Sequence, residues 1–308
     1  MSATPTSVLQ EWHVTEPYLH LHCALGEGPF YEATTNSLRF VDIKKKRVHW
    51  VKLDEGPASV TTVQLDTPVT ITSDIEGVDP RERILIGVKY GIAVLDRKTG
   101  KYEYVARFAE SDNERLRSND GAADPHGRFW LGSMTDIGLD LQPEGHVFLF
   151  SGNPVAQSMR YPVTIPNAIG WSPDKKIMYF THSTERTVFA WDYSVEDGTL
   201  SNERVFYRHE GPGEPDGFRI DTDGNLWHAV YGESRVLKIS SEGKLIGQIN
   251  LPTHNITCTQ FVGTELFITT AGMAEGEGSD KAVQLSGAVF KVDVGARGLE
   301  PFTFKLHK

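Results

Sequence analysis

Hydrophobic positions along the chain rarely recur every three or four residues, which is the spacing of an amphipathic helix. Instead, short runs of β-branched and aromatic residues alternate with polar positions, and turns rich in Gly, Asp, Asn and Pro separate these runs. Alternation with a period of two is the pattern of a strand with one buried face. The sequence therefore predicts an all-β fold built from many short strands.

One element recurs six times: a polar turn followed by a strand with alternating large apolar residues. The six copies start at positions 36, 82, 127, 175, 224 and 264, so that successive starts are 46, 45, 48, 49 and 40 residues apart. A second strand-like run follows each copy, as Arg47–Lys52 follows the first. A period of about 40 to 50 residues with several strands per unit is typical of propeller blades. The sequence predicts a six-bladed β-propeller with four antiparallel strands in each blade.

The ring of blades has to close, and no linker-like stretch divides the chain. We expect residues 1–308 to form one propeller domain, with residues 1–14 as a loosely ordered N-terminal extension. The segments expected to close the ring are the strand-like residues 20–24 and the C-terminal residues 301–306. The Gly-rich residues 271–286 fall inside the last unit and are expected to form a long surface loop.

The net charge of −10 disfavours nucleic acid and anionic membrane as partners. The one dense basic run, from Lys44 to Arg47, is expected to be a solvated turn. No apolar run reaches the roughly 20 residues that span a bilayer, and residues 1–10 lack the features of a secretory signal. The two cysteines, Cys23 and Cys258, lie outside any CxxC motif, which favours a reducing compartment. We expect a cytoplasmic protein, either a monomer or a weak homodimer.

Four polar residues share one phase of the repeat. Glu27 lies 9 residues before the first unit start, and Asn119, Asn167 and Asp216 each lie 8 before theirs. Because the innermost strand of each blade lines the channel, residues at one phase should lie at one height around it. Carboxylates and amide carbonyls gathered there would suit a hard cation. The alternative is that these residues merely mark turns. Asp74 has the same spacing but sits in a loop-like stretch, and we interpret that match as accidental.

These motifs are similar to those of the SMP-30/gluconolactonase/LRE-like family, whose animal members are called regucalcin or senescence-marker protein 30. Nearly the whole chain, from about Leu25 to Phe304, takes part in the resemblance. Each motif alone is weak, but their order and spacing together are highly specific. The four segments that carry the resemblance are Gly26-Glu27-Gly28-Pro29, Arg117-Ser118-Asn119-Asp120-Gly121 with Asp124, Asn167-Ala168-Ile169-Gly170-Trp171-Ser172, and Pro215-Asp216-Gly217.

The resemblance implies a six-bladed propeller with one divalent metal ion in its central channel. It places the metal ligands on Glu27, Asn167 and Asp216, and the substrate-binding residues on Arg117 and Asn119. Ca²⁺ is the favoured ion, with Zn²⁺, Mn²⁺, Mg²⁺ and Fe²⁺ as alternatives. Many members open sugar-acid lactones. The implied function is therefore a carboxylic-ester hydrolase of carbohydrate catabolism that converts a small sugar lactone to its aldonic acid.

The chain departs from the family pattern at two places near the expected pocket. Asp136 and Ile137 stand where some members carry a Glu, which leaves the identity of the sugar open. His182 stands where an Asp is usual. We expect it to pack in a turn or a blade, with a place in the pocket wall as the alternative. Met134 and Tyr231 are candidates for the pocket rim, although Met134 is expected to belong to the blade core.

Hydrolysis of a lactone needs a polarised carbonyl and an activated water. Asp216 is the candidate catalytic residue, acting as a general base beside the metal while also serving as a ligand. Arg117 suits the lactone oxygens or the product carboxylate through its planar set of donors. A salt bridge from Arg117 to Asp120 or Asp124 is the alternative.

Two other functions are compatible with such a site. One is a metal-dependent phosphotriesterase-like hydrolase, and the other is a non-enzymatic metal-binding propeller of the regucalcin type. A propeller that only binds other proteins has no need of carboxylates in its channel. The ring of polar residues therefore disfavours a pure protein-interaction role.

Overall fold

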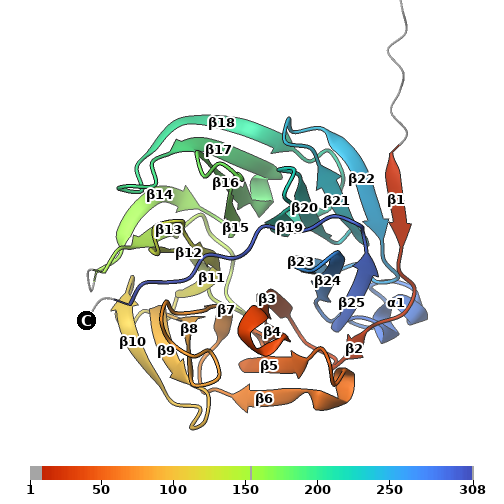
Figure 1. Cartoon of the computed structure of the whole chain (residues 1–308), viewed down its shortest axis with the longest axis horizontal. Coiled ribbons are helices and arrows are strands. Elements are labelled where there is room, and N and C mark those ends of the chain that lie inside the picture. Colours follow the sequence, from red (N-terminus) through yellow and green to blue (C-terminus); the bar gives the residue numbers. More distant parts are fainter. Residues whose placement is uncertain (1–8, 153–154, 307–308) are drawn as a thin grey trace, which may run out of the picture.

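The computed structural model describes residues 9–152 and 155–306, which form six β-sheets arranged as blades around a central channel (Figure 1). Consecutive strands within each blade pair antiparallel, and the first strand of each blade lies at the channel. The predicted six-bladed propeller with four antiparallel strands per blade is confirmed. The repeat starts found in the sequence fall one or two residues before the second strand of each blade.

The first three blades are meanders of four strands that are consecutive in the sequence. Their strands are β3 (Gly26–Glu32), β4 (Ser37–Asp42), β5 (Arg47–Lys52) and β6 (Thr61–Gln64); β7 (Val69–Ser73), β8 (Arg83–Val88), β9 (Gly91–Asp96) and β10 (Tyr102–Arg107); and β11 (Leu116–Ala123), β12 (Phe129–Thr135), β13 (Gly145–Phe150) and β14 (Gln157–Val163).

The next two blades repeat this order, and the sixth has only its three inner strands from this part of the chain. These strands are β15 (Pro166–Trp171), β16 (Ile177–His182), β17 (Thr187–Tyr193) and β18 (Leu200–Arg208); β19 (Glu214–Ile220), β20 (Leu226–Tyr231), β21 (Arg235–Ile239) and β22 (Leu245–Asn250); and β23 (Ile256–Val262), β24 (Glu265–Thr270) and β25 (Ala288–Asp293).

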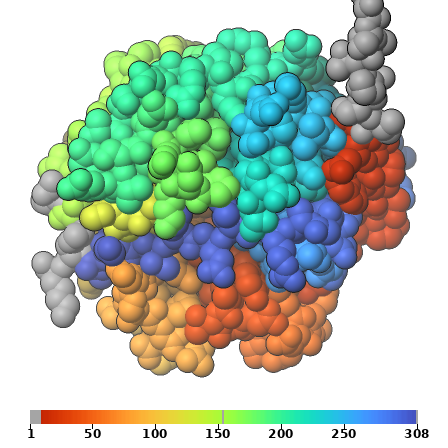
Figure 2. Space-filling view, turned by 45° about the horizontal axis from the view of Figure 1, so that its top comes forward, coloured from red at the N-terminus to blue at the C-terminus, as the bar shows by residue number. Residues whose placement is uncertain are grey.

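The N-terminal region closes the ring. Strand β2 (Leu19–His20) pairs antiparallel with β25 and supplies the fourth strand of the sixth blade. The closing strand thus overlaps the expected residues 20–24 only at His20. The C-terminal residues 301–306, the second expected closing segment, add no strand to a blade within the described part of the chain. They cross one face of the ring (Figure 2), where Phe304 forms a parallel bridge with Ile75.

The expectation of a loosely ordered N-terminal extension is wrong for residues 10–13. They form β1 (Gln10–His13), which pairs parallel with β22 as a fifth strand on the outer edge of the fifth blade. Trp12 packs on Trp227 of that blade, with 5.2 Å between ring centroids. Burial of these two aromatic rings against each other explains why this short edge strand is held in place. Residues 1–8 lie outside the described residues.

Six hydrophobic clusters hold the ring together, and each lies between two neighbouring blades. In one of them, Trp130 of the third blade packs with Phe180 of the fourth, and both side chains are fully buried. A blade therefore buries its apolar faces only against its neighbours, as in other repeat architectures. The inner strands, which face the channel, are left to carry polar side chains.

Helical structure is confined to short pieces in the described residues. The helix α1 (Asp280–Gln284) lies within the expected surface loop 271–286, and the Ser279 side chain caps it by accepting a hydrogen bond from the Ala282 N–H at 3.2 Å. Three single 3₁₀ turns are at Ala33–Thr35, Pro57–Ser59 and Ser183–Glu185. None of the helices in these residues has the length and apolar character needed to cross a membrane.

Candidate functional site

Every inner strand carries a bulge near the same end of the channel. In β3, Glu27 pairs with Val41 and Phe30 pairs with Arg39, so three steps on one strand oppose two on the other. The same shift occurs in β11, β15 and β19, and a one-residue shift also occurs in β7 and β23. A bulge inserts one residue and redirects its side chain out of the regular alternation. The polar residues predicted from the repeat phase all lie at these bulges.

The bulges of β3, β11, β15 and β19 border an open pocket at one end of the channel. Glu27, Asn167 and Asp216, the predicted metal ligands, line this pocket together with Arg117 and Asn119, the predicted substrate-binding residues. The fold therefore brings all five predicted site residues together from four blades. The other residues that line the pocket are Leu25, Ile43, Lys44, Met134, Ile165, Ser183, Glu214 and Tyr231.

Local hydrogen bonds orient two of the predicted metal ligands. The Gly28 N–H donates to Glu27 Oε2 at 2.7 Å, and the Ala168 N–H donates to Asn167 Oδ1 at 3.1 Å. Gly28 has a φ of +53°, in the left-handed region that glycine adopts without strain. The Asn167 Nδ2 donates to Ser183 Oγ at 3.2 Å. The amide is thereby fixed with a carbonyl lone pair still available to a ligand.

Asp216 lies where β19 packs closely against β23. A Cβ built on the following residue, Gly217, would lie 2.3 Å from Cys258 Sγ, so only glycine permits this approach. The backbone oxygen of Asp216 accepts a hydrogen bond from His228 Nε2 at 3.1 Å. The backbone on both sides of the carboxylate is therefore fixed by packing and hydrogen bonding.

Burial and mutual repulsion dominate the electrostatics of the pocket floor. Burial, together with the charge of Asp120, raises the pKa of Glu27 to about 8. Burial, with the charges of Glu27 and Asp120, raises the pKa of Asp216 well above its ordinary value. Burial also raises the pKa of Asp120, whose Oδ2 has no hydrogen-bond partner within the described residues. Three buried carboxylates that influence one another in this way are costly unless protons or a cation neutralise them.

The donor set fits a hard divalent cation. Glu27, Asn167 and Asp216 are 7 %, 5 % and 9 % exposed, and all three offer oxygen, the donor that Ca²⁺ and Mg²⁺ prefer. Across residues 9–152 and 155–306, no group of three His, Cys, Asp or Glu side chains could hold an ion by itself. An ion at this place would therefore depend on the amide oxygen of Asn167 as well as on the two carboxylates.

Arg117 and Asn119 form one wall of the pocket. The Arg117 Nη1 donates to the Ser118 carbonyl oxygen at 2.7 Å and to Asn119 Oδ1 at 2.9 Å. The Asn119 Nδ2 donates to the Pro166 carbonyl oxygen of the next blade at 2.9 Å. The buried Arg117 Nε has no partner in the described part of the chain, so the guanidinium keeps a donor to offer. Burial lowers the pKa of Arg117 to about 10, which leaves it a cation at neutral pH.

The alternative of a salt bridge from Arg117 to Asp124 is wrong. The Asp124 carboxylate is occupied by Arg128, whose Nε lies 2.7 Å from Asp124 Oδ2, and by Trp130 Nε1 at 3.1 Å. Asp120 likewise makes no ion pair within 4 Å with Arg117 in the described residues, and its Oδ2 is unpartnered. Asp124 is therefore a structural residue of its blade, whereas Arg117 faces the pocket.

The two departures from the family pattern lie beside the pocket rather than in its wall. The Asp136 carboxylate forms an ion pair with Lys89 Nζ at 2.6 Å. His182 is 3 % exposed, and its Nε2 accepts a hydrogen bond from the Thr164 N–H at 3.0 Å. Neither Asp136 nor His182 is among the lining residues. The expectation that His182 packs within a blade is borne out by this burial and hydrogen bond.

Three polar lining residues, Lys44, Ser183 and Glu214, were not predicted from the sequence. Lys44 is exposed in a turn, as expected for this basic run, and it also lines the pocket. Ser183 lies in the wall and accepts the Asn167 hydrogen bond. Met134, expected to be core, is buried but also lines the pocket, as does the partly exposed Tyr231. The signal that could have found Lys44 is its position two residues past the end of β4, the strand that pairs with the Glu27 bulge.

Asp74, whose phase match was interpreted as accidental, lies outside this pocket. It directly follows β7 at the opposite end of the channel, where its Oδ1 lies 3.1 Å from Arg39 Nη2. In that blade the bulge holds Thr70, whose Oγ1 lies 2.9 Å from Ser118 Oγ. A phase counted from the next strand could not locate this bulge, because the turn between β7 and β8 is longer than its counterparts.

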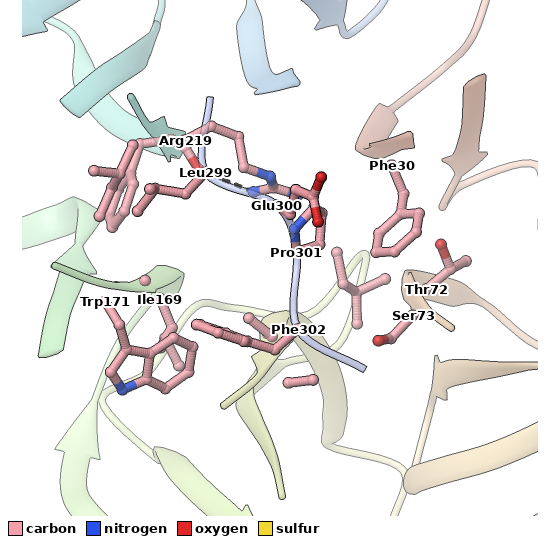
Figure 3. A pocket seen from close by; sticks show the side chains of 17 residues that line it. Phe30, Thr72, Ser73, Ile169, Trp171, Arg219, Leu299, Glu300, Pro301 and Phe302 are labelled. Atoms are coloured by element: carbon pink, nitrogen blue, oxygen red, sulfur yellow. Dashed lines mark hydrogen bonds between the residues drawn. The ribbon is translucent and has the colours of Figure 1, made fainter. Parts of the chain in front are cut away.

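A second pocket, of about 630 Å³, lies at the opposite end of the channel beneath the C-terminal segment (Figure 3). Apolar side chains such as Phe30 and Trp171 make up much of its wall, and Arg219 is its one basic residue. The Arg219 guanidinium already donates to Gln260 Oε1 at 3.0 Å and to the Pro29 carbonyl oxygen at 3.1 Å. The side chains at this end of the channel therefore mainly pack against one another, and the predicted site residues lie at the other end.

Comparison with known proteins finds related chains and folds over most of its length. Residues 25–272 match the family described as SMP-30/Gluconolactonase/LRE-like region. The chain is 32 % identical over 289 residues to pentonolactonase XacC of Haloferax volcanii, a match that covers 91 % of this chain and 94 % of that protein. It is 33 % identical over 298 residues to regucalcin of Homo sapiens, covering 92 % and 95 % of the two chains.

A solved structure of the same fold is a calcium-binding protein, regucalcin, from Agrobacterium tumefaciens. It aligns with 98 % of this chain and 100 % of its own length with a TM-score of 0.84, at 22 % sequence identity. A likeness at that identity supports the fold and the arrangement of the blades.

Proposed function

Because the chain belongs to the SMP-30/gluconolactonase/LRE-like family, we propose that it is a metal-dependent hydrolase that opens sugar-acid lactones to aldonic acids in carbohydrate catabolism. The observation that carries the proposal is the pocket floor, where buried Glu27 and Asp216 have raised pKa values and lie beside the amide of Asn167. The similarity to a pentonolactonase at 32 % identity supports a lactone as the substrate.

In this proposal Glu27, Asn167 and Asp216 hold one divalent cation. When bound, the ion supplies Lewis-acid polarisation of the lactone carbonyl and lowers the pKa of a water molecule. Ca²⁺ is the favoured ion because all three ligands offer oxygen, and the calcium-binding regucalcin of the same fold supports this choice. Zn²⁺, Mn²⁺, Mg²⁺ and Fe²⁺ remain alternatives to be compared by experiment.

Arg117 and Asn119 orient the lactone. Asn119 is fixed by its hydrogen bond to the Pro166 carbonyl oxygen and in turn fixes Arg117. The Arg117 side chain lines the pocket, and its guanidinium can donate to a lactone oxygen or hydroxyl there. After ring opening the same cation suits the new carboxylate, since charge-assisted hydrogen bonds are the stronger kind. Product binding and substrate orientation thus use one preorganised side chain.

Asp216 acts as the general base. Its carboxylate accepts a proton from the water that attacks the carbonyl carbon, and the carbon–oxygen bond of the ring ester then breaks. The departing ring oxygen takes up a proton and becomes a hydroxyl, so the proton held at Asp216 returns to the products and no group is consumed. The burial of Asp216 keeps bulk water from competing for this proton.

A substrate panel tests the proposal directly. The purified protein is stripped of metal with a chelator and reloaded with each candidate ion, and turnover of gluconolactone, xylonolactone, arabinonolactone and rhamnonolactone is compared with that of a phosphotriester. Metal-dependent lactone turnover is expected. Phosphotriester turnover alone would indicate the phosphotriesterase-like alternative, and metal binding without any turnover would indicate a non-enzymatic propeller of the regucalcin type.

A further inference from the structure

The three inner strands that carry the predicted metal ligands are only briefly paired on the pocket side of their bulges. β15 has one pair there, Pro166 with His182, and β3 and β19 have two pairs each. Pro166 and Pro215 have no N–H to donate to the neighbouring strand. β11, which carries Arg117 and Asn119 instead, has three pairs before its bulge. The ladders alone therefore hold the backbone before each predicted ligand only weakly.

In each of these three blades, a buried side chain from the end of the second strand, or from just past it, accepts a hydrogen bond from the backbone that leads into the predicted ligand. At most 5 % of each accepting side chain is exposed. The donor lies two or three residues before the ligand in every case. The three hydrogen bonds run from the Leu25 N–H to Asp42 Oδ1 at 3.1 Å, from the Thr164 N–H to His182 Nε2 at 3.0 Å, and from the Gly213 N–H to Glu233 Oε1 at 3.0 Å.

Glu233 holds both ends of the segment 209–213, which leads into β19. Its Oε1 accepts a hydrogen bond from His209 Nε2 at 3.0 Å in addition to the one from the Gly213 N–H, and its Oε2 pairs with Arg235 at 2.7 Å. A Cβ built on Gly211 would overlap Glu233 Oε1, so the segment wraps around this carboxylate with no room for a side chain. Loss of Glu233 would therefore release the backbone just before Asp216.

His182 has the same place in the fourth blade. Its Nε2 can accept the Thr164 N–H only while the imidazole is neutral, and burial lowers the pKa of His182, which favours that form. The next residue, Ser183, donates its N–H to the Ile165 carbonyl oxygen at 3.1 Å and accepts the hydrogen bond from the Asn167 side chain. The anchor thus adjoins the contact that orients the predicted ligand.

We propose that Asp42, His182 and Glu233 are positioning residues, each of which fixes the backbone before one predicted metal ligand. The inference rests on the proposed function, in which the three ligands hold one divalent cation. None of the three anchors lines the pocket, so each acts through the backbone and not by touching an ion or a substrate. Donors held in place before binding lose less conformational freedom when a ligand arrives, which strengthens binding.

Hydrogen exchange of the metal-free protein tests the anchoring itself. In Asp42→Ala, His182→Ala and Glu233→Ala, the peptide that contains residue 25, 164 or 213, respectively, should exchange about fivefold faster than in the parent. The equivalent peptides of the other two blades should be unchanged, so each variant is a control for the others. His182→Gln, whose side-chain oxygen can accept the same N–H, should restore slow exchange. Unchanged exchange in the alanine variants would overturn the inference.

Calorimetric titration tests the link from the anchors to the ligands. The ion is the one of Ca²⁺, Zn²⁺, Mn²⁺, Mg²⁺ and Fe²⁺ that binds the parent most tightly. The alanine variants should bind it about tenfold more weakly, and His182→Gln should bind it nearly as tightly as the parent. Denaturation curves, recorded alongside, show that each variant is folded at the temperature of the titration.

Asp96→Ala is the matched control for both measurements. Asp96 accepts the Thr99 N–H at 2.8 Å, so the same kind of hydrogen bond is lost, but in a turn outside the pocket. Ion affinity and the exchange of the three peptides should be unchanged in this variant.

The outcomes separate this inference from the function on which it rests. A parent protein that binds none of the five ions would overturn the proposed function and this inference with it. If the parent binds an ion and the alanine variants bind it equally well, or if Asp96→Ala weakens it as much as they do, only the role assigned to Asp42, His182 and Glu233 is overturned.

Discussion

Strand β3 carries two buried glutamates, one near each end of the channel, and their surroundings are opposite. Glu27 accepts one hydrogen bond from its neighbouring Gly28 N–H. Glu32 is fully buried and forms ion pairs with Arg39 and with Arg97, whose Nη1 lies 2.9 Å from Glu32 Oε1. Burial acts to raise the pKa of each carboxyl. At Glu32 the two guanidinium groups outweigh burial, so that its pKa is lowered overall, whereas the pKa of Glu27 is raised to about 8.

This difference distinguishes buried acidic residues that stabilise the fold from those available to bind a ligand. At the Glu32 end, Glu32 pairs with Arg39 and Arg97, and Asp74 pairs with Arg39, so these buried charges neutralise one another. At the Glu27 end, Asp216 and Asp120 add negative charge that the described residues do not neutralise. Unbalanced buried charge of this kind marks the end at which a cation and a substrate are expected to bind.

The largest expected effect is on activity, at Asp216. Replacing Asp216→Ala removes a metal ligand and the general base together, so kcat/KM for a sugar lactone should fall by at least about 10³-fold and calorimetric metal binding should be lost. The control is Asp221→Asn in the same blade, whose carboxylate accepts the Trp227 Nε1 hydrogen bond at 2.9 Å and lies outside the pocket. The Asp221→Asn variant should lose stability but keep metal binding. If the Asp216→Ala variant were as active as the parent, the assignment of Asp216 to the active site would be wrong.

The next effect is on stability, at the other end of the channel. Arg39→Met should lower the free energy of unfolding by about 3–5 kcal/mol, because it deprives buried Glu32 of a partner. Chemical denaturation of the metal-free protein measures this. Adding Glu32→Gln to the same variant should restore part of the loss, since the stranded charge is then absent. Equal stability of the single and double variants would show that Arg39 acts through packing alone.

A third effect concerns pH and the metal-free protein. The pKa of Glu27 is about 8 in the folded protein, against an ordinary value of 4.5 that applies to the unfolded chain. Between pH 4.5 and pH 8, the folded state therefore holds a proton that the unfolded state has released. Stability of the metal-free protein should therefore fall as pH rises from about 4.5 to about 8. Glu27→Gln should flatten this slope and stabilise the metal-free protein at pH 8 on the order of 2 kcal/mol. Denaturation curves across this pH range check it. Part of the slope should remain, because the pKa values of Asp216 and Asp120 are also raised, and a slope that does not change at all would exclude Glu27 as a source.

The smallest expected effect is at Asp120, whose Oδ2 has no hydrogen-bond partner among the residues that the structure describes. Asp120→Asn removes one negative charge near the pocket floor while leaving the three predicted ligands in place. Metal affinity should weaken about tenfold, as for other residues that support a metal site from outside the ligand set. Calorimetric titration measures the change, with Asp124→Asn as a control because the Arg128 ion pair already neutralises that carboxylate. An unchanged affinity for Asp120→Asn would assign Asp120 to the channel structure rather than to ion binding.

Much of the site could be predicted because the repeat preserves phase. Asn119, Asn167 and Asp216 lie the same number of residues before the next strand, and the fold places them in one pocket. The same count misplaced Asp74, because the turn after β7 is longer and its bulge holds Thr70 instead. Counting along the chain works only where the turns between strands have the same length.

Alternating apolar residues and the spacing of polar turns determined the number of blades and the order of their strands, because both are properties of short segments repeated along the chain. Which charges remain unpaired was decided only by the tertiary structure. Glu27 and Glu32 lie on the same strand and are the same residue type, but Arg39 and Arg97 approach Glu32 whereas Asp120 and Asp216 lie near Glu27. The same holds for Lys44, which resembles its neighbours in sequence and is distinguished by facing the pocket rather than its own blade. Such differences depend on contacts between residues far apart in the sequence, and a local pattern carries no information about them.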